Sequence, residues 1–142
     1  QIGVEVVIKN LPARTYFGET LKKQQFTALA QLAWSSNPES PPTSTLATSG
    51  IPTAANNFAG ANYPHFSHPG MDKLIDEVQR ELDPAKRKPL WFEMQKIYTD
   101  ELPVLPLFFR TDVYVVPKWL TGILRPGQLP SNYYGVETWG VR

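Results

Sequence analysis

Residues 70–103 read GMDKLIDEVQRELDPAKRKPLWFEMQKIYTDELP and carry the clearest structural signal in the chain. In the first half, apolar residues recur at helical spacing, at Met71, Leu74, Ile75, Val78 and Leu82. This spacing predicts a helix with one buried face. The charged residues between them are expected to face water: Asp72, Lys73, Asp76, Glu77, Arg80 and Glu81.

A second helix is predicted after Asp83-Pro84, because Asp is a favoured N-cap and Pro suits the first helical position. Its apolar residues are Leu90, Trp91, Met94, Ile97, Tyr98 and Leu102. Together the two segments predict a helical hairpin. Pro89 conflicts with this pattern, since a proline inside a straight helix costs about 3 kcal/mol. We therefore expect either a kink at Pro89 or a helix that begins later.

Outward from the hairpin, the pattern predicts strands on either side of a short helix. Residues 4–8 are mostly β-branched and apolar, which predicts a strand. Residues 12–23 form an amphipathic stretch that begins with a proline, which predicts a short helix. Residues 26–34 (FTALAQLAW) are favoured as a second strand. Residues 104–116 are predicted to be extended. The expected fold is α/β. A small mixed sheet would form near Val4, Leu29 and Leu107, covered by the helix near Phe17 and by the hairpin.

The segment 35–69 is long, polar and rich in Pro, Ser, Thr and Asn. Connections of more than about 15 residues in a compact domain are usually working loops or disordered. Buried-looking residues favour an ordered loop over plain disorder: Leu46, Ile51, Phe58, Tyr63 and Phe66. The last residues, 117–142, are aromatic but show no clear period.

Composition sets limits on function. A chain of 142 residues favours one domain, and no apolar run approaches the about 18 residues of a membrane span. The net charge of +1 gives no field that would attract nucleic acid. The chain has no cysteine and no nucleophile, phosphate-loop or metalloprotease motif, so we expect no enzyme, no metal and no cofactor. Because Gln1 leads directly into a predicted strand, we expect a segment of a longer protein.

The order of segments resembles a known family. The chain is similar to the last third of the oligopeptide- and dipeptide-binding proteins of ABC importers. The likeness lies in this succession of segments: VEVVIKNLP, a helix, a strand ending in AW, a Pro- and Ser-rich loop, FSHPGMDKLIDEV, LDPAKRKPLWFEMQKIYTDELPVLPLFFR and VYVVPKWLTGI. The most specific part is Ser-x-Pro-x-x-Asp-x-Leu-Ile, then Asp-Pro-x-x-Arg, then Glu-Leu-Pro-Val-Leu-Pro-Leu, in that order. The likeness covers nearly the whole chain.

The resemblance implies a two-lobed binding protein that closes on its ligand by a hinge. Residues 1–116 would be part of the C-terminal ligand-binding lobe, and residues 117–142 a tail returning toward a missing N-terminal lobe. The expected partners are a peptide or similar small solute, that lobe and the ABC permease, and the expected location is periplasmic or extracellular, at the membrane through the transporter. The family's ligand contacts fall on Gln31, Ala33, Trp34, Ser35, Ser36 and Asn37.

One position departs from the family. Where peptide-binding relatives place an Asp against the ligand's amino terminus, this chain offers Asn37. An amide replaces a charge-assisted bond of about 1.5–3 kcal/mol by a neutral one of about 0.5–1.5 kcal/mol. We expect weaker recognition of a free ammonium unless Glu39 supplies the charge.

Other interpretations stay open. Trp34 is either a ligand contact or core, and His65 with His68 is a weak metal signal that fits polar loop residues better. Relatives of the family also carry nickel, sugars or opines. A stand-alone protein-interaction domain that uses the 35–69 loop is the main alternative, and a sealed surface would favour it over a missing lobe.

Overall fold

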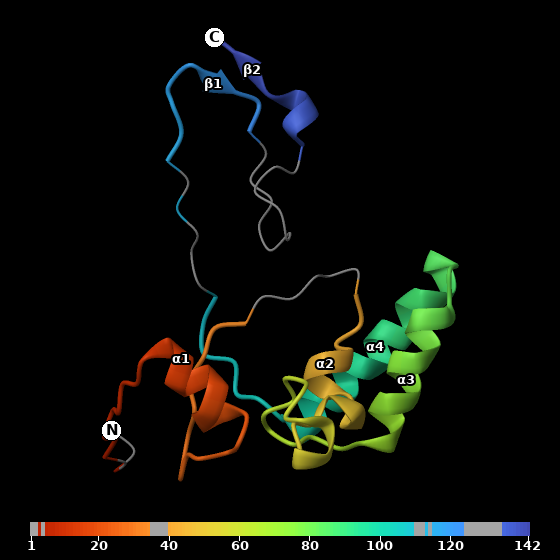
Figure 1. The fold of residues 1–142 in the computed structure, drawn as a ribbon. Helices are drawn as coiled ribbons and strands as arrows, with labels where there is room; N and C mark the ends of the chain where they lie inside the picture. The colour runs from red at the N-terminus through yellow and green to blue at the C-terminus, as the bar shows by residue number, and fades with distance from the viewer. Residues whose placement is uncertain (1–2, 4, 35–39, 110–112, 114, 124–134) are drawn as a thin grey trace.

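A helical hairpin is the largest ordered part of the computed structural model, which describes residues 3, 5–34, 40–109, 113, 115–123 and 135–142. Helix α3 spans Pro69–Arg80 and helix α4 spans Pro84–Glu101. The two helices lie side by side (Figure 1). The hairpin predicted from residues 70–103 is confirmed.

The core lies where this hairpin meets the preceding loop. Its buried members are Ala47, Met71, Ile75, Val78 and Met94. Partly buried residues pack against them: Leu46, Phe66, Leu74, Leu90, Trp91, Ile97 and Tyr98. The first turn of each helix is capped by a side chain, by the predicted Asp83 in α4 and by His68, which was not predicted as a cap, in α3. The Asp83 carboxylate accepts from the Ala85 N–H at 2.9 Å, and His68 Nδ1 accepts from the Met71 N–H at 3.1 Å.

Helix α4 continues through Pro89 without interruption. A later start of this helix was one of two expected outcomes, and it is wrong because Asp83 and Pro84 already supply a complete helix start. The helix ends at Glu101 and is followed by its C-cap Leu102, which adopts a left-handed conformation with φ 44° before Pro103.

The helix predicted over 12–23 is confirmed as α1, Ala13–Thr15, continued by a π-helical turn over Tyr16–Leu21. Thr20 and Leu21 are its buried residues. The wide final turn is closed by Lys23, whose ammonium pairs with Glu19.

The loop before the hairpin is ordered over residues 40–69. It contains α2, Thr43–Leu46, and two 3₁₀ turns, Thr48–Gly50 and Ala54–Asn56. Asn62 is completely buried at its centre and ties the loop to itself. The Asn62 amide nitrogen donates to the carbonyls of Ala47 and Phe66 at 2.9 and 2.7 Å, and its oxygen accepts from the Phe66 N–H at 2.9 Å. The ordered alternative for this loop is therefore confirmed for the described residues.

The sheet differs from the expected one. Within the described residues it has two antiparallel strands, β1, Leu120–Thr121, and β2, Gly140–Val141, in the register Leu120↔Val141 and Thr121↔Gly140. A 3₁₀ turn, Val136–Thr138, precedes β2. This ribbon lies in the part of the sequence with no clear period, apart from the helices (Figure 1). In broad terms the fold is helical with a small sheet, which is compatible with an α/β fragment.

Among the described residues, the strands predicted near Val4, Leu29 and Leu107 are not formed. Val4 itself lies outside the described residues, and the described parts of 5–8, 26–34 and 104–116 are extended but unpaired with one another. Many of their side chains are exposed, with Val7 86% exposed, Leu29 91% and Phe109 87%. Strand propensity is a local property, whereas a ladder needs a neighbouring backbone, and the described residues supply none here.

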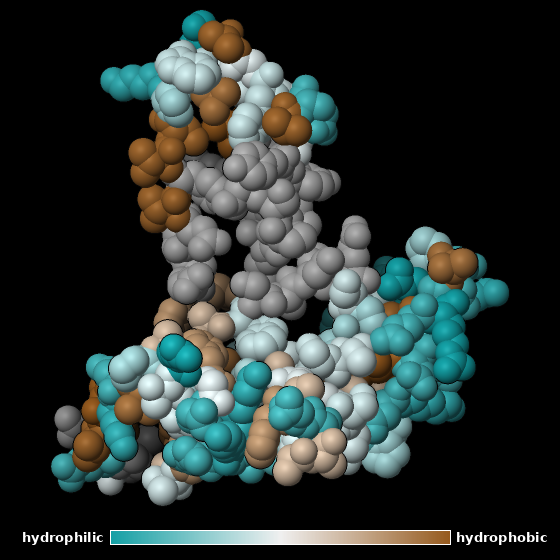
Figure 2. All heavy atoms as spheres, viewed as in Figure 1, coloured by the Kyte–Doolittle hydropathy of each residue, from teal (hydrophilic) through white to brown (hydrophobic). Residues whose placement is uncertain are grey.

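Hydrophobic and charged surfaces are separated on the molecule. Figure 2 shows hydrophobic atoms along the extended segment that leads into β1 and hydrophilic atoms over α3. None of the described helices is long and apolar enough to cross a membrane.

Candidate functional site

The predicted ligand-contact residues fall at the end of an extended segment. Gln31, Ala33 and Trp34 are all exposed, while Ser35, Ser36, Asn37 and Glu39 lie outside the described residues. Gln31, Ala33 and Trp34 are thus the described part of the predicted site. They follow the π-helical turn and precede α2.

The backbone of residues 26–34 is almost free of partners. Among described residues its one hydrogen bond comes from the Tyr16 hydroxyl, which donates to the Gln31 carbonyl at 2.8 Å. Burial raises the pKa of the Tyr16 hydroxyl above its ordinary 10.0, an effect partly offset by the bond to Gln31. The segment is thus attached to the helix at one point and otherwise offers N–H and C=O groups to a partner strand or ligand.

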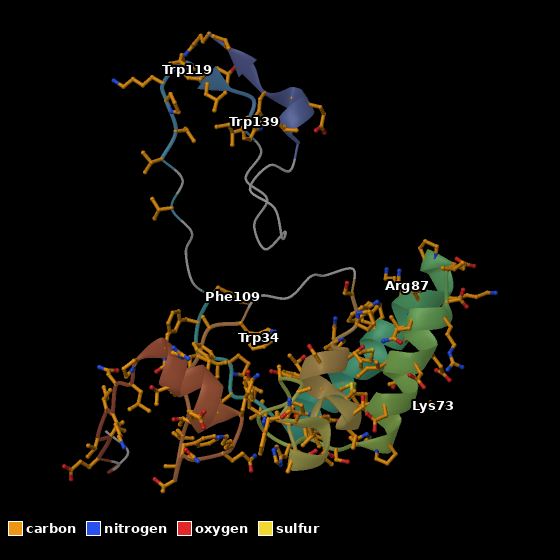
Figure 3. All side chains as sticks on the ribbon, in the orientation of Figure 1. Trp34, Lys73, Arg87, Phe109, Trp119 and Trp139 are labelled. Carbon is orange, nitrogen blue, oxygen red and sulfur yellow. The ribbon has the colours of Figure 1, made fainter. Side chains whose placement is uncertain are left out.

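Trp34 lies at the exposed end of this segment. Its side chain is 53% exposed, and it meets Tyr63 edge to face, with ring centroids 6.2 Å apart and planes at 80°. In Figure 3 the indole lies between the segment that carries α1 and the group of helices α2, α3 and α4. Trp34 is therefore not a core residue, which was the alternative interpretation of its sequence.

Tyr63 is the residue near this site that sequence reasoning missed. Its position in the chain indicated only a buried-looking aromatic residue in a loop. The loop brings it to Trp34, and the Gln24 side-chain amide donates to the Tyr63 carbonyl at 3.1 Å. No pattern in the sequence pairs two aromatic residues across so long a loop.

Two other polar candidates have structural roles. His68 is the cap of α3 and stacks on Phe66, with ring centroids 6.1 Å apart. Asp72, expected to be solvated, accepts from the Thr48 N–H at 2.8 Å and from its hydroxyl at 2.6 Å, while that hydroxyl also contacts the Ser67 hydroxyl. These contacts hold the loop against α3 and do not form a site of their own.

A shallow hollow of about 390 Å³ lies beside the turn that joins α3 to α4. Its lining residues are Glu77, Arg80, Glu81, Lys86 and Leu90. The described contact residues Gln31, Ala33 and Trp34 do not line it, and its mixed charges give no clear preference for one ligand. The exposed wall at residues 26–34 remains the better candidate.

Comparison with known proteins gave one relative at a significant level. The chain is 29% identical over 126 residues to the oligopeptide-binding protein OppA of Bacillus subtilis (strain 168). The alignment covers 89% of this chain and 22% of that protein, so the chain spans about a fifth of the relative's length. No protein-family model matches the chain. No solved structure matches it at a significant level.

Proposed function

We propose that this chain is one wall of the ligand cleft in an extracytoplasmic solute-binding protein that delivers peptides to an ABC importer. The wall would consist of Gln31, Ala33 and Trp34, continued by Ser35, Ser36, Asn37 and Glu39. A second lobe of the same protein would close over it, and the permease would receive the cargo. The chain itself would carry out no chemical step and need no cofactor.

The observation that carries the proposal is the unpaired backbone of residues 26–34. A segment with free N–H and C=O groups and an exposed aromatic residue at its end can add an extended peptide by main-chain hydrogen bonds. Such bonds hold any peptide without reading its side chains. The likeness to an oligopeptide-binding protein supports a peptide as the extended partner.

The exposed apolar segments support the presence of a second lobe. Val6, Val7 and Ile8 are largely exposed, as are Leu107, Phe108 and Phe109. Leaving such side chains in water forfeits about 1.5–3 kcal/mol for each one that could be buried. In the proposed two-lobed protein, these segments would pair with strands of the remaining chain. A stand-alone interaction domain is expected to bury most of its apolar residues, so two separate exposed apolar segments favour a missing lobe.

The proposal is tested by titrating ligand-stripped intact protein with a pentapeptide. Isothermal titration calorimetry should give saturable binding at a ratio of one to one. Hydrogen exchange of residues 26–34 should slow when the peptide is bound, because its backbone then gains partners. No binding of any peptide in a mixed library would refute the proposal.

A second titration addresses the altered anchor. We compare the affinities of a peptide with a free amino terminus and of its acetylated form. The two affinities should differ less here than in a relative that binds the amine with an Asp. If Glu39 takes the anionic role, Glu39→Gln should equalise the two affinities while Asn37→Ala leaves their ratio unchanged. A large preference for the free amine that survives Glu39→Gln would contradict this assignment.

A further inference from the structure

Tyr63 is held in place from both sides. Before it in the chain, the buried Asn62 side chain binds the carbonyls of Ala47 and Phe66. From the other side, the Gln24 amide donates to the Tyr63 carbonyl at 3.1 Å. These bonds fix the Tyr63 backbone between the loop and the end of the π-helical turn. Its ring can therefore serve as a rigid support.

The ring that Tyr63 supports is that of Trp34. The 80° angle and 6.2 Å separation are those of an edge-to-face pair, which is favourable because the positive edge of one ring meets the negative face of the other. Within the described residues Trp34 makes no hydrogen bond and no other ring contact. Tyr63 is thus the one aromatic partner of the indole among the described residues.

With 53% of Trp34 exposed, the pair leaves indole surface open beside the unpaired backbone of residues 26–34. We propose that Tyr63 is a positioning residue that orients Trp34 as a stacking platform for an aromatic side chain of the bound peptide. The inference rests on the proposed function, since it assumes that a peptide lies along this segment. It adds a preference among peptides that main-chain hydrogen bonding alone cannot give.

An aromatic side chain fits this site better than a cationic one. Neither Trp34 nor Tyr63 has an ion pair or a cation–π contact among the described residues, and the group that fixes Tyr63 is the neutral Gln24 amide. The nearby ammonium of Lys23 already pairs with Glu19 and lies 5.9 Å from the Phe58 ring centroid. A stacked ring needs no counter-charge, and among the described residues no carboxylate is bonded to Trp34 or Tyr63 that could pair with a ligand cation at this point.

The test uses ligand-stripped intact protein and pentapeptides of alanine that carry one Phe, Leu or Arg at each position in turn. Calorimetry should show that at one position the Phe peptide binds about three- to tenfold more tightly than the Leu peptide. Trp34→Ala should abolish this ratio. Tyr63→Leu should reduce it to less than twofold, while Tyr63→Phe, which keeps the ring, should preserve it.

Matched controls separate positioning from folding. Phe58→Leu removes another aromatic residue of the same loop that does not contact Trp34, and it should leave the Phe-to-Leu ratio unchanged. If Tyr63→Leu does not fold, Gln24→Asn gives the second test, because Asn suits the left-handed φ of 51° but is too short to hold Tyr63. This variant should lower the ratio with no loss of melting temperature.

The outcomes separate a failure of the proposed function from a failure of the aromatic subsite. If no peptide binds, the proposed function fails and this inference fails with it. If peptides bind but no position favours Phe, or if the preference survives both Tyr63→Leu and Trp34→Ala, the aromatic subsite is refuted and the peptide-binding function stands. A preference for Arg over Phe at the Trp34 position would also overturn it.

Discussion

Replacement of Asn62 by alanine should loosen the whole loop before α3. The side chain makes three hydrogen bonds, to the carbonyls of Ala47 and Phe66 and from the Phe66 N–H. A buried backbone group that loses its hydrogen-bond partner costs about 1–3 kcal/mol. The two bonds to Phe66 are only partly buried, so water can replace part of their contribution. We expect Asn62→Ala to lower the free energy of unfolding by about 2–4 kcal/mol.

Hydrogen exchange followed by mass spectrometry of the intact protein measures this loss locally. At about 1.4 kcal/mol per factor of ten, backbone amides over residues 61–66 should exchange about 30- to 1000-fold faster if the loop opens on its own. The amide at position 62 is a direct probe, because it donates to the Gly50 carbonyl at 3.0 Å. Amides in the middle of α4 should change less.

Two variants complete this experiment. Asn62→Asp keeps the acceptor for the Phe66 N–H but replaces both donor contacts by repulsion between oxygens, so it should be at least as damaging as alanine. Asn57→Gly is the matched control, since Asn57 is exposed with φ 54° and glycine adopts that conformation freely. A stability change below about 0.5 kcal/mol for Asn62→Ala would refute the role given to this side chain.

Three further changes test the packing. Gly60→Ala should destabilise the loop by more than about 2 kcal/mol in denaturant unfolding, because φ is 97° and a Cβ would collide with the Gly50 carbonyl oxygen; an unchanged midpoint would contradict the close approach. Pro89→Ala should raise the unfolding free energy by about 1–3 kcal/mol by restoring a helical hydrogen bond, and a loss of stability would show that the ring has a packing role. Burial raises the pKa of Tyr98, so the unfolded chain ionises first and stability should fall as pH rises past 10.0; Tyr98→Phe should flatten this decline, and an equally steep decline would refute the assignment.

The helices could be predicted from sequence because their signals are local. Apolar spacing and the Asp83-Pro84 start define α3 and α4, and these interactions all lie within a few turns of chain. Pro89 shows the limit of such reasoning. A single unfavourable residue was outweighed by the helix start before it and by the packing of Met94 and its neighbours in the core.

The sheet and the site could be predicted only in part, because both depend on distant partners. Residues 5–8 and 26–34 have the composition of strands, but pairing is not encoded in the strand itself. The contact of Trp34 with Tyr63 and the burial of Asn62 likewise depend on how a long polar loop folds back. The family resemblance identified Trp34 as a candidate, and nothing in the sequence gave a signal for the tyrosine that contacts it.

Native mass spectrometry of the intact protein, purified from its host without denaturation, tests the central claim most directly. If the protein binds peptides, the spectrum should show a ladder of species that are heavier than the bare protein by the masses of short peptides. Fragmentation of the released ligands should give peptide sequences. Bare protein that fails to take up any peptide added afterwards, or a bound ligand that is not a peptide, would contradict it.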